Sequence, residues 1–495
     1  PVGALTSKPY AFNARPWELD SVESVDVMDA VGSNIRVDSR SGRVLRILPV
    51  VNDDINEEWI SDKTRFVWDG LGRQRLDKPY IRRNGKLEAA GWDEALGLVA
   101  EKLKGDPERI AALAGDLCDA ESMKALKDLM DSLGVKNIDC RQDGAQIGGG
   151  VRSEYLFNTT IAGIEQADAI LIVGSNPRLE APLVNTRIRK TWLNGDAEVA
   201  LIGDNVDLTY PYEHLGTGPA DISKFTASTK GFARKFKAAK NPMIIIGQGA
   251  LSRKDGAQVL KLCSELAAKF KVVKDGWNGF NVLHNAASRV GGLDMGFIPA
   301  EGGLSTSGIL SGAASGDVKT VYLLGADELD TSALKEAFVI YQGSHGDAGA
   351  HVADVILPAA AYTEKSGLYV NTEGRVQMGN AAVAPKGDAK EDWAIIRALS
   401  GHVGRVLPYD NLDALREDLF EKHPTFAGLD YAPGDDAVLT LDLKSVGAAG
   451  RVLAAPFTGT ITDFYMTNPI ARASEVMAEC SAVKRADDAV QEAAE

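Results

Sequence analysis

Short apolar segments that each end in glycine are the feature that most restricts how this chain can fold. Five of them are spread over the middle of the sequence, and stretches with the apolar periodicity of amphipathic helices lie between them. Continuous apolar strands joined by helices are typical of a mainly parallel sheet covered by helices on both faces. The strand candidates are Ile110–Ala114, Ala169–Val173, Val199–Ile202, Met243–Ile246 and Val321–Leu324, and the helix candidates are Glu121–Leu133, Asp255–Phe270 and Thr331–Ala337.

The span 92–390 is long enough for two such sheet units. Ahead of it, Ser33–Asp38 and Arg43–Pro49 are short β-type runs separated by the turn signal Ser41-Gly42. After about residue 400 the periodicity weakens. The predicted fold class is therefore α/β, with a small β-rich N-terminal domain, two doubly wound parallel-sheet units and an irregular C-terminal extension.

Composition excludes several kinds of protein. A net charge of −15 argues against a nucleic-acid-binding surface, which needs a basic patch. No apolar run approaches the roughly 20 residues that span a bilayer, so we expect any membrane association to run through partners. The chain begins at Pro1 rather than Met, so we expect a processed chain or a piece of a longer one.

The cysteine pattern argues against a metal cluster held by this chain. Iron–sulfur clusters usually need several thiolates, at least two of them close in sequence. No Cys-x2-Cys or Cys-x3-Cys pair exists, and buried, inert thiols are the better interpretation. The four cysteines are Cys118, Cys140, Cys263 and Cys480.

Two further patterns allow a functional and a structural interpretation. Gly174 and Gly247 end strands at the sheet edge where nucleotides and pterin cofactors dock, but ordinary strand-to-helix turns also favour glycine there. His345 and His351 have Asp347 and Asp354 nearby, yet their spacing follows no zinc pattern. In both cases we favour the structural interpretation, and we assign no catalytic residue and no metal ligand.

Several segments spread nearly from end to end of the chain carry a resemblance to known proteins. They are 1–12 (PVGALTSKPYAF), 15–19 (RPWEL), 54–66 (DINEEWISDKTRF), 69–71 (DGL), 353–358 (ADVILP), 363–367 (TEKSG), 371–377 (NTEGRVQ) and 462–470 (TDFYMTNPI). These segments resemble one family, the large iron–sulfur subunit (75 kDa type) of respiratory complex I, and the later ones also look like the molybdopterin oxidoreductase superfamily.

The resemblance implies an organisation in four parts. Residues 1–20 would lead in from iron–sulfur modules that precede Pro1, and 21–80 would form a degenerate 4Fe-4S domain of molybdopterin-enzyme type. Residues 81–400 would form the molybdopterin-oxidoreductase-like α/β domains, and 401–495 a C-terminal extension.

The same resemblance implies that cofactor ligands are missing here. The family's Cys-x2-Cys-x3-Cys motif falls on Asp26, Asp29 and Ser33, whose oxygens do not replace the soft thiolates that iron requires. The molybdenum ligand position falls near Ala145, and Cys140 comes several residues too early. We therefore expect no cofactor in this chain, 2Fe-2S and 4Fe-4S clusters in the segment before Pro1, and FMN in a partner subunit.

These implications predict a non-catalytic scaffold within proton-translocating NADH:quinone oxidoreductase. Expected partners are the flavin/NADH-binding subunit, the small 2Fe-2S subunit and the quinone-module subunits. The expected location is the peripheral arm, at the cytoplasmic face of the bacterial inner membrane or the matrix side of the mitochondrial one. The alternatives are a live molybdenum or tungsten oxidoreductase similar to formate dehydrogenase, and a free-standing nucleotide-binding module.

Overall fold

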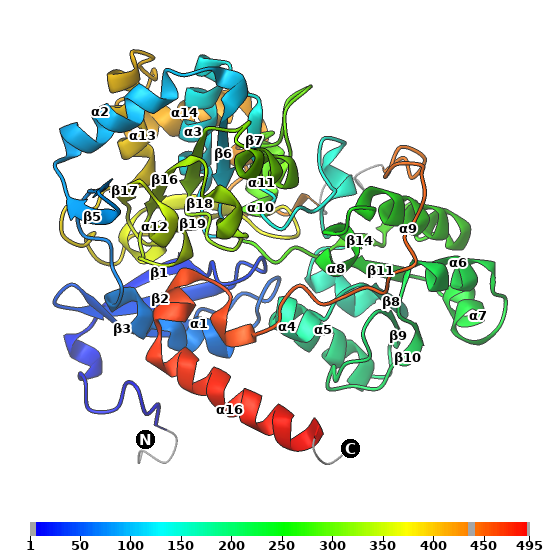
Figure 1. Cartoon of the computed structure of the whole chain (residues 1–495). Coiled ribbons are helices and arrows are strands. Elements are labelled where there is room, and N and C mark those ends of the chain that lie inside the picture. The colour runs from blue at the N-terminus through cyan, green and yellow to red at the C-terminus, as the bar shows by residue number, and fades with distance from the viewer. Residues whose placement is uncertain (1–5, 434–440, 493–495) are drawn as a thin grey trace.

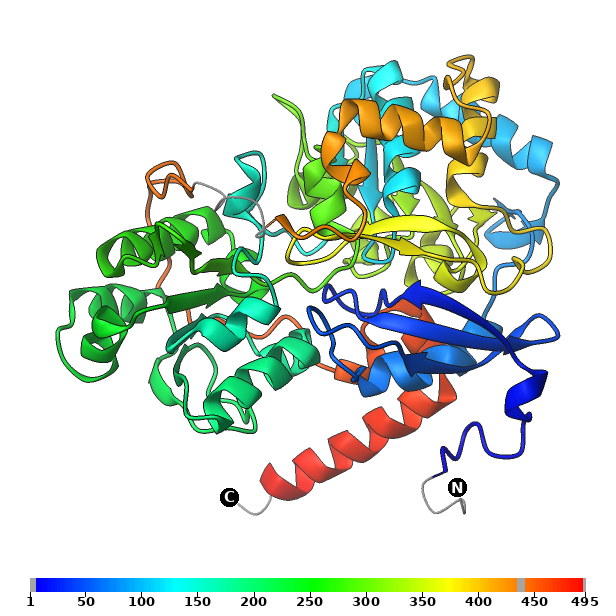
Figure 2. The ribbon, with the colours of Figure 1, turned by 180° about the vertical axis from the view of Figure 1, so that it is seen from behind.

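The computed structural model describes residues 6–433 and 441–492, which form three bodies around a common centre (Figure 1). The first body is an antiparallel sheet near the N-terminus, and each of the other two is built on a larger sheet. Figure 2 shows the same bodies from behind, with one larger unit above the N-terminal sheet, the other larger unit beside that sheet, and the long C-terminal helix below. In the described part of the chain, no helix is long and apolar enough to cross a membrane.

The N-terminal sheet has the order β1-β2-β3 and pairs Val22 with Val37 and Val37 with Ile47. Its inner face packs against the short helices that follow it and against the C-terminal segment. The elements are η1 (Pro16–Glu18), β1 (Asp20–Val25), β2 (Asn34–Arg40), β3 (Arg43–Pro49), α1 (Asp62–Phe66), η2 (Val67–Gly72), η10 (Phe464–Met466), α15 (Pro469–Ala473) and α16 (Glu475–Glu492).

The second body is a seven-stranded sheet with the order β5-β4-β17-β16-β15-β6-β7. Its strands from β17 to β7 are parallel, and β4 and β5 add an antiparallel edge. The strands are β4 (Tyr80–Arg83), β5 (Lys86–Ala89), β6 (Ile110–Ala114), β7 (Asn137–Asp139), β15 (Thr320–Leu324), β16 (Phe338–Gly343) and β17 (Val355–Pro358).

Helices cover both faces of this sheet because alternate strand residues point to opposite sides. Ala112 and Leu324 pack with the helices of one face, whereas Leu113 and Leu323 pack with those of the other. The helices are α2 (Trp92–Leu103), α3 (Ala120–Leu133), α13 (Asp392–Val403) and α14 (Leu412–Lys422) on the first side, and α11 (Thr306–Ser315), η6 (Thr331–Leu334) and α12 (Ala348–Val352) on the second.

The third body is an all-parallel five-stranded sheet with the order β10-β9-β8-β11-β14. Helix α5 lies on one face, and α6, α7 and α9 lie on the other. The elements are β8 (Ala169–Val173), α4 (Pro177–Glu180), α5 (Pro182–Leu193), β9 (Glu198–Ile202), β10 (Glu213–Gly216), α6 (Pro219–Ala227), α7 (Gly231–Ala238), β11 (Pro242–Ile246), α8 (Gln248–Leu251), α9 (Gly256–Phe270), β12 (Val273–Lys274), β13 (Trp277–Asn278) and β14 (Phe280–Val282).

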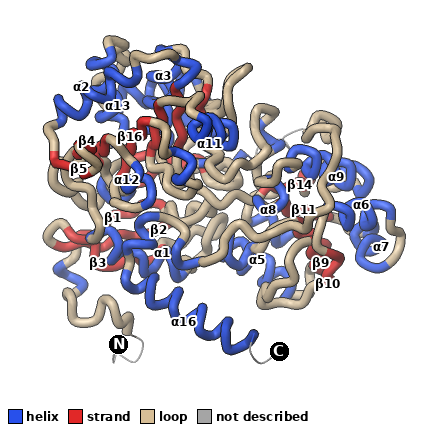
Figure 3. The backbone as a smooth tube through the Cα atoms, in the orientation of Figure 1, coloured by secondary structure: helices blue, strands red, loops and turns tan. Residues whose placement is uncertain are grey.

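Connecting segments join the two sheet units near their carboxyl ends. Figure 3 shows that much of this central region is loop rather than helix or strand. The remaining elements are η3 (Pro107–Arg109), η4 (Arg152–Glu154), η5 (Ala162–Gln166), α10 (Arg289–Asp294), η7 (Tyr362–Glu364), the hairpin β18 (Gly367–Val370) and β19 (Val376–Gly379), and η8 (Pro424–Ala427).

The predicted α/β class is confirmed, with a β-rich N-terminus and two sheets whose central strands are parallel. One predicted helix, Thr331–Ala337, is wrong, since only the 3-10 turn η6 forms there. Asp330 accepts a hydrogen bond from the backbone N–H of Ser332 and caps this turn. The chain then has only three residues before β16 begins at Phe338, which leaves no room for an α-helix.

Candidate functional site

The loop between β1 and β2 contains the three positions predicted to replace cluster cysteines. Asp26, Asp29 and Ser33 are all buried, and the Asp26 N–H donates to the Ser33 carbonyl at 2.9 Å. Each carboxylate also accepts a backbone N–H two residues onward, Asp26 from Met28 and Asp29 from Val31. The structure therefore brings the three predicted positions together in one compact loop.

Helix α1 supplies partners for this loop that the sequence did not reveal. The Thr64 hydroxyl donates to Asp26 Oδ2 at 2.9 Å and lies 2.7 Å from the Ser61 hydroxyl. Ser61 is also the N-cap of α1 and accepts from the Thr64 N–H. The only signal in the sequence was a serine three residues ahead of a threonine, which is typical of a helix start.

Lys63 is the second group that sequence reasoning missed. It is only 2% exposed, its ammonium donates to Thr467 Oγ1 at 2.9 Å, and it lies 5.0 Å from the centre of the Phe464 ring. Burial lowers the pKa of Lys63, while the nearby carboxylates of Asp29 and Asp26 oppose that shift. Lys63 thus connects the β1–β2 loop to the C-terminal segment.

Burial also decides the protonation of the two carboxyl groups. It raises the pKa of Asp26 to about 7, and the negative charge of Asp29 adds to the shift. Burial likewise raises the pKa of Asp29, and the charge of Lys63 partly offsets that rise. Both carboxyl groups therefore take up protons more readily than free aspartate does, and the positive charge of Lys63 opposes this for Asp29.

The residues at this loop do not fit an iron–sulfur cluster. No cysteine occurs between residues 19 and 69. The four cysteines of the chain lie elsewhere and are free thiols, three of them buried and Cys480 partly exposed. Cluster iron needs thiolates, and the carboxylate and hydroxyl oxygens found here are hard ligands.

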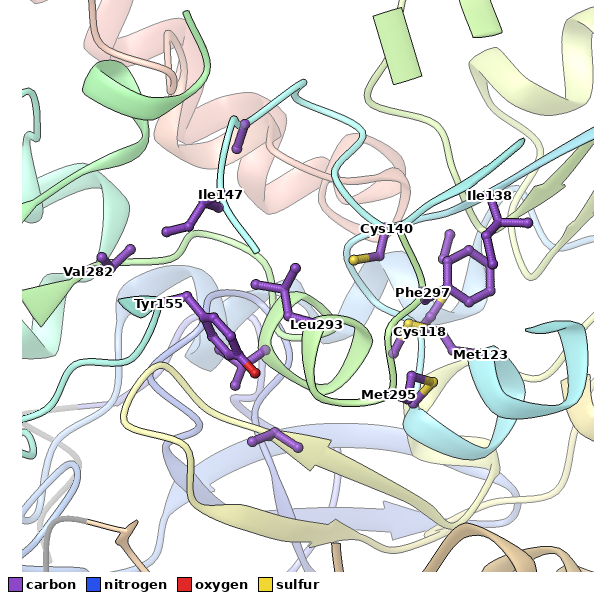
Figure 4. Close-up of a cluster of buried hydrophobic side chains, with 14 of the residues drawn as sticks. Cys118, Met123, Ile138, Cys140, Ile147, Tyr155, Val282, Leu293, Met295 and Phe297 are labelled. Carbon is purple, nitrogen blue, oxygen red and sulfur yellow. The ribbon is translucent and has the colours of Figure 1, made fainter. Parts of the chain in front are cut away.

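The predicted molybdenum position shows the same lack of a ligand. Ala145 is 1% exposed and offers no donor atom from its side chain. Cys140 follows β7 and lies in an apolar cluster with Ile138, Met295 and Phe297 (Figure 4). Burial raises the pKa of the Cys140 thiol to about 12, so it stays protonated rather than becoming a thiolate.

The two histidines near residue 350 do not form a metal site with each other. His345 has partners at both ring nitrogens, the Ser344 hydroxyl at 2.8 Å and the Gly70 carbonyl at 3.0 Å. Burial, with the charge of Arg75, lowers the pKa of His345 to about 3. Within the described residues, no group of three His, Cys, Asp or Glu side chains has a geometry that holds a metal ion.

The glycines that end the strands of the five-stranded sheet serve close packing. A Cβ on Gly247 would lie 2.3 Å from the Ser175 Cβ, and one on Gly174 would lie 2.7 Å from the Ala250 Cβ. Neighbouring protein atoms therefore account for the absence of side chains at both positions, without a bound phosphate.

A cavity of about 360 Å³ lies where the three bodies meet. Residues that follow strands of both large sheets line it, among them Asp116 after β6 and Asn285 after β14. The β1–β2 loop contributes Asp29, and the C-terminal segment closes another side with Thr460 and Arg472. In doubly wound proteins, ligands bind at this edge of the sheet.

Comparison with known proteins first defines the class. A family model described as molybdopterin oxidoreductase matches residues 75–402. The acetylene hydratase structure from Pelobacter acetylenicus superposes with a TM-score of 0.59 and 14% identity, covering 83% of this chain and 72% of that one. That likeness shows the fold alone, which is the molybdopterin oxidoreductase fold.

Relatives with higher identity define the family. The mitochondrial NADH dehydrogenase [ubiquinone] iron-sulfur protein 1 of Solanum tuberosum is 47% identical over 98% of this chain and 64% of its own length. The corresponding NADH-quinone oxidoreductase subunit of Rickettsia bellii is 45% identical over 98% of this chain and 69% of its own. The chain therefore belongs to the family of the large iron–sulfur subunit of NADH-quinone oxidoreductase, and it spans about two thirds of the length of these relatives.

Two shorter family models agree with this assignment. The model described as NADH-ubiquinone oxidoreductase NDSU1/NuoG-like, 4Fe-4S domain matches residues 19–69, and a model of the C-terminal region of the same oxidoreductase subunit matches 433–480. The resemblance read from the sequence is thus confirmed. The first match covers Asp26, Asp29 and Ser33, the three positions predicted to replace cluster cysteines.

Proposed function

We propose that this chain is the non-catalytic scaffold portion of the large iron–sulfur subunit of proton-translocating NADH:quinone oxidoreductase. The observation that carries the proposal is the β1–β2 loop, where Asp26, Asp29 and Ser33, the predicted cluster positions, are buried together and the Thr64 hydroxyl donates to Asp26. A loop that protein hydrogen bonds hold in this way has no need of iron to keep its shape. The chain supports electron transfer by holding its neighbours in place and has no catalytic, cofactor-binding or metal-binding residue of its own.

The four-part division of the chain is part of the proposal. Residues 1–20 are the lead-in, 21–80 the degenerate cluster domain, 81–400 the α/β domains and 401–495 the C-terminal extension. The antiparallel sheet within 20–49 and the start of β4 at Tyr80 support the first boundaries. Residues 1–5, 434–440 and 493–495 lie outside the described part of the chain.

Cofactors and partners follow from the family. The 2Fe-2S and 4Fe-4S clusters belong to a segment preceding Pro1, and FMN belongs to a partner subunit. The partners are the flavin/NADH-binding subunit, the small 2Fe-2S subunit and the quinone-module subunits, with no nucleic acid. The proposed location is the peripheral arm, at the cytoplasmic face of a bacterial inner membrane or the matrix side of a mitochondrial one.

Metal analysis of the purified full chain tests the proposal. Iron, acid-labile sulfide, molybdenum and tungsten should all be far below one per chain after anaerobic purification and cluster reconstitution. The matched control is the triple variant Asp26→Cys, Asp29→Cys, Ser33→Cys, which should take up more iron under the same conditions because it restores thiolates to the loop. Stoichiometric iron with an iron–sulfur spectrum in the unaltered chain would overturn the proposal.

The alternative function is an active molybdenum or tungsten oxidoreductase similar to formate dehydrogenase. The match of the molybdopterin oxidoreductase model to residues 75–402 supports this alternative. The relatives with higher identity support the complex I assignment instead. Molybdenum or tungsten bound together with a pterin would favour the alternative, and the same metal analysis detects it.

A further inference from the structure

The central cavity contains buried polar atoms that have no partner in the described protein. Asp29 Oδ2 and Gln142 Oε1 belong to side chains that are 2% and 5% exposed, and both residues line the cavity. Asp116 Oδ1 and Asn285 Oδ1, from two more lining residues, are also unpaired. Four acceptor oxygens from separate segments thus converge on one space without a donor.

Fewer hydrogen-bond donors than acceptors are unpaired among the side chains that line the cavity. Arg289 is 2% exposed, and its Nε and Nη1 atoms have no partner, while Nη2 donates to Asp143 at 2.8 Å. Arg472 is engaged by Glu328 and Asp347, and the Lys63 ammonium is engaged by Thr467. The unpaired acceptors therefore outnumber the unpaired donors among the lining groups.

The acidic and basic side chains that line the cavity also favour a cationic ligand. Six of the lining side chains are carboxylic acids and three are cationic. Burial raises the pKa of Glu328 to about 8 and that of Glu180 to about 7, and it also raises the pKa of Asp116. Burial is the main cause of each shift, and a neighbouring carboxyl group adds to it for Glu328 and Asp116. The acids are Asp29, Asp116, Asp143, Glu180, Glu328 and Asp463, and the cations are Lys63, Arg289 and Arg472.

We propose that this cavity binds a small organic cation that carries N–H donors, an amine or a guanidine. Such a molecule supplies the donors that Asp29, Asp116 and Gln142 lack, and its charge compensates the excess of carboxylates. A phosphate-bearing ligand offers mainly acceptor oxygens and would leave the unpaired acceptors of the cavity without donors. A bare metal ion is disfavoured because no described cluster of three acidic, histidine or cysteine ligands is present.

The segment 457–463 runs past the cavity, and its residues 460–463 form part of the cavity wall. Figure 1 shows it as an orange-red stretch without regular structure that runs from the five-stranded unit toward α15. The Gly459 N–H donates to Asp204 Oδ2 at 3.1 Å, and Asn285 Nδ2 donates to Thr460 Oγ1 at 2.8 Å. This segment leaves room for a compact ligand and gives Asn285 a fixed orientation in the wall that it shares with Asp116.

Calorimetric titration of the full chain with agmatine and putrescine tests the proposal, with choline and inorganic pyrophosphate as counter-probes. We expect saturable binding of agmatine or putrescine and none of choline, which is cationic but has no N–H donor. Pyrophosphate should not bind. Absence of binding by both amines, or equal binding of choline, would overturn the proposal.

Two variants that change charge in opposite directions separate a binding site from a loss of folding. Asp116→Asn keeps the shape of the side chain and should weaken amine binding about tenfold or more, whereas Asn285→Asp adds a carboxylate and should strengthen it several-fold. Asp275→Asn, in the exposed turn between β12 and β13, is the matched control and should leave affinity unchanged. Weakening by both cavity variants, or by neither, would contradict the proposed site.

Discussion

At the scale of single residues, hydrogen bonds to buried side chains hold the β1–β2 loop in place. Asp26 is completely buried, yet each of its carboxylate oxygens has a hydrogen-bond donor, from the Met28 N–H and from the Thr64 hydroxyl. A buried carboxyl group without such partners would be costly. The prediction that oxygen side chains replace sulfur ligands at Asp26, Asp29 and Ser33 came from the family resemblance, and the structure brings these three positions together in one loop. The sequence did not predict Lys63, since its partner Thr467 lies 404 residues away.

We expect Thr64→Val to destabilise the chain. The variant keeps the shape of the side chain but leaves Asp26 Oδ2 buried without a donor, which costs about 1–3 kcal/mol. Urea unfolding followed by circular dichroism measures the effect. Thr186→Val is the control, because Thr186 is exposed and only bonds the Pro182 carbonyl of its own helix, so its change should stay below about 0.5 kcal/mol. Equal effects for the two variants would show that the Thr64 hydroxyl is dispensable.

Asp26 should also give the stability of the chain a characteristic pH dependence. Its pKa is about 7 in the folded chain against 3.8 for the free group, so folding takes up a proton between these values. This contribution is complete below about pH 4 and is lost as the pH rises through 7. Asp26→Asn does not titrate, so its stability relative to wild type should rise between pH 5 and 7, by at most about 1.4 kcal/mol per pH unit. Urea unfolding at several pH values measures this difference in the free energy of unfolding between Asp26→Asn and wild type. A difference that does not change between pH 5 and 7 would contradict the raised pKa of Asp26.

At the scale of elements, the sequence predicted the strands that are apolar throughout and missed those that are polar or short. The five predicted strands correspond to β6, β8, β9, β11 and β15, because each is buried on both faces and is therefore apolar almost throughout. Strand β1, with the sequence DSVESV, is half exposed and carries no such run. Its pairing with β2 and its contact with the C-terminal segment stabilise it, and neither is visible in a local window.

Contact between η2 and α15 should depend on the absence of a side chain at Gly70. A Cβ there would lie 2.1 Å from the Ile470 carbonyl oxygen, whereas at Gly72 nothing lies within 4 Å. Gly70→Ala should therefore cost about 1–3 kcal/mol through overpacking and should loosen the C-terminal segment. Limited proteolysis and hydrogen exchange of residues 469–486 measure the loosening. Gly72→Ala is the matched control, and the same result for both variants would refute the expected clash.

At the scale of the whole molecule, the central cavity arises from the packing of the three bodies and not from any one motif. Its lining residues come from loops that are far apart in the sequence, such as those of Asp29, Asp143 and Arg472. The sequence analysis named the carboxyl ends of the strands as the edge where ligands dock in this fold class, but it favoured ordinary turns there. It could not indicate which acids would converge, because loops after strands carry no register that a sequence pattern reveals.

Arg187 on α5 connects two of these bodies and should couple their unfolding. It is 4% exposed, pairs with Glu165 at 2.6 Å, and donates to the carbonyls of Asp53 and Ile55 in the loop after β3. Arg187→Met keeps most of the apolar stem but removes these donors, so we expect a loss of about 2–3 kcal/mol and a broader thermal transition as the N-terminal sheet separates from the five-stranded unit. Differential scanning calorimetry measures both quantities. Arg189→Met on the exposed side of the same helix should change neither, and a sharp, unshifted transition in Arg187→Met would show that the bodies are coupled by other contacts.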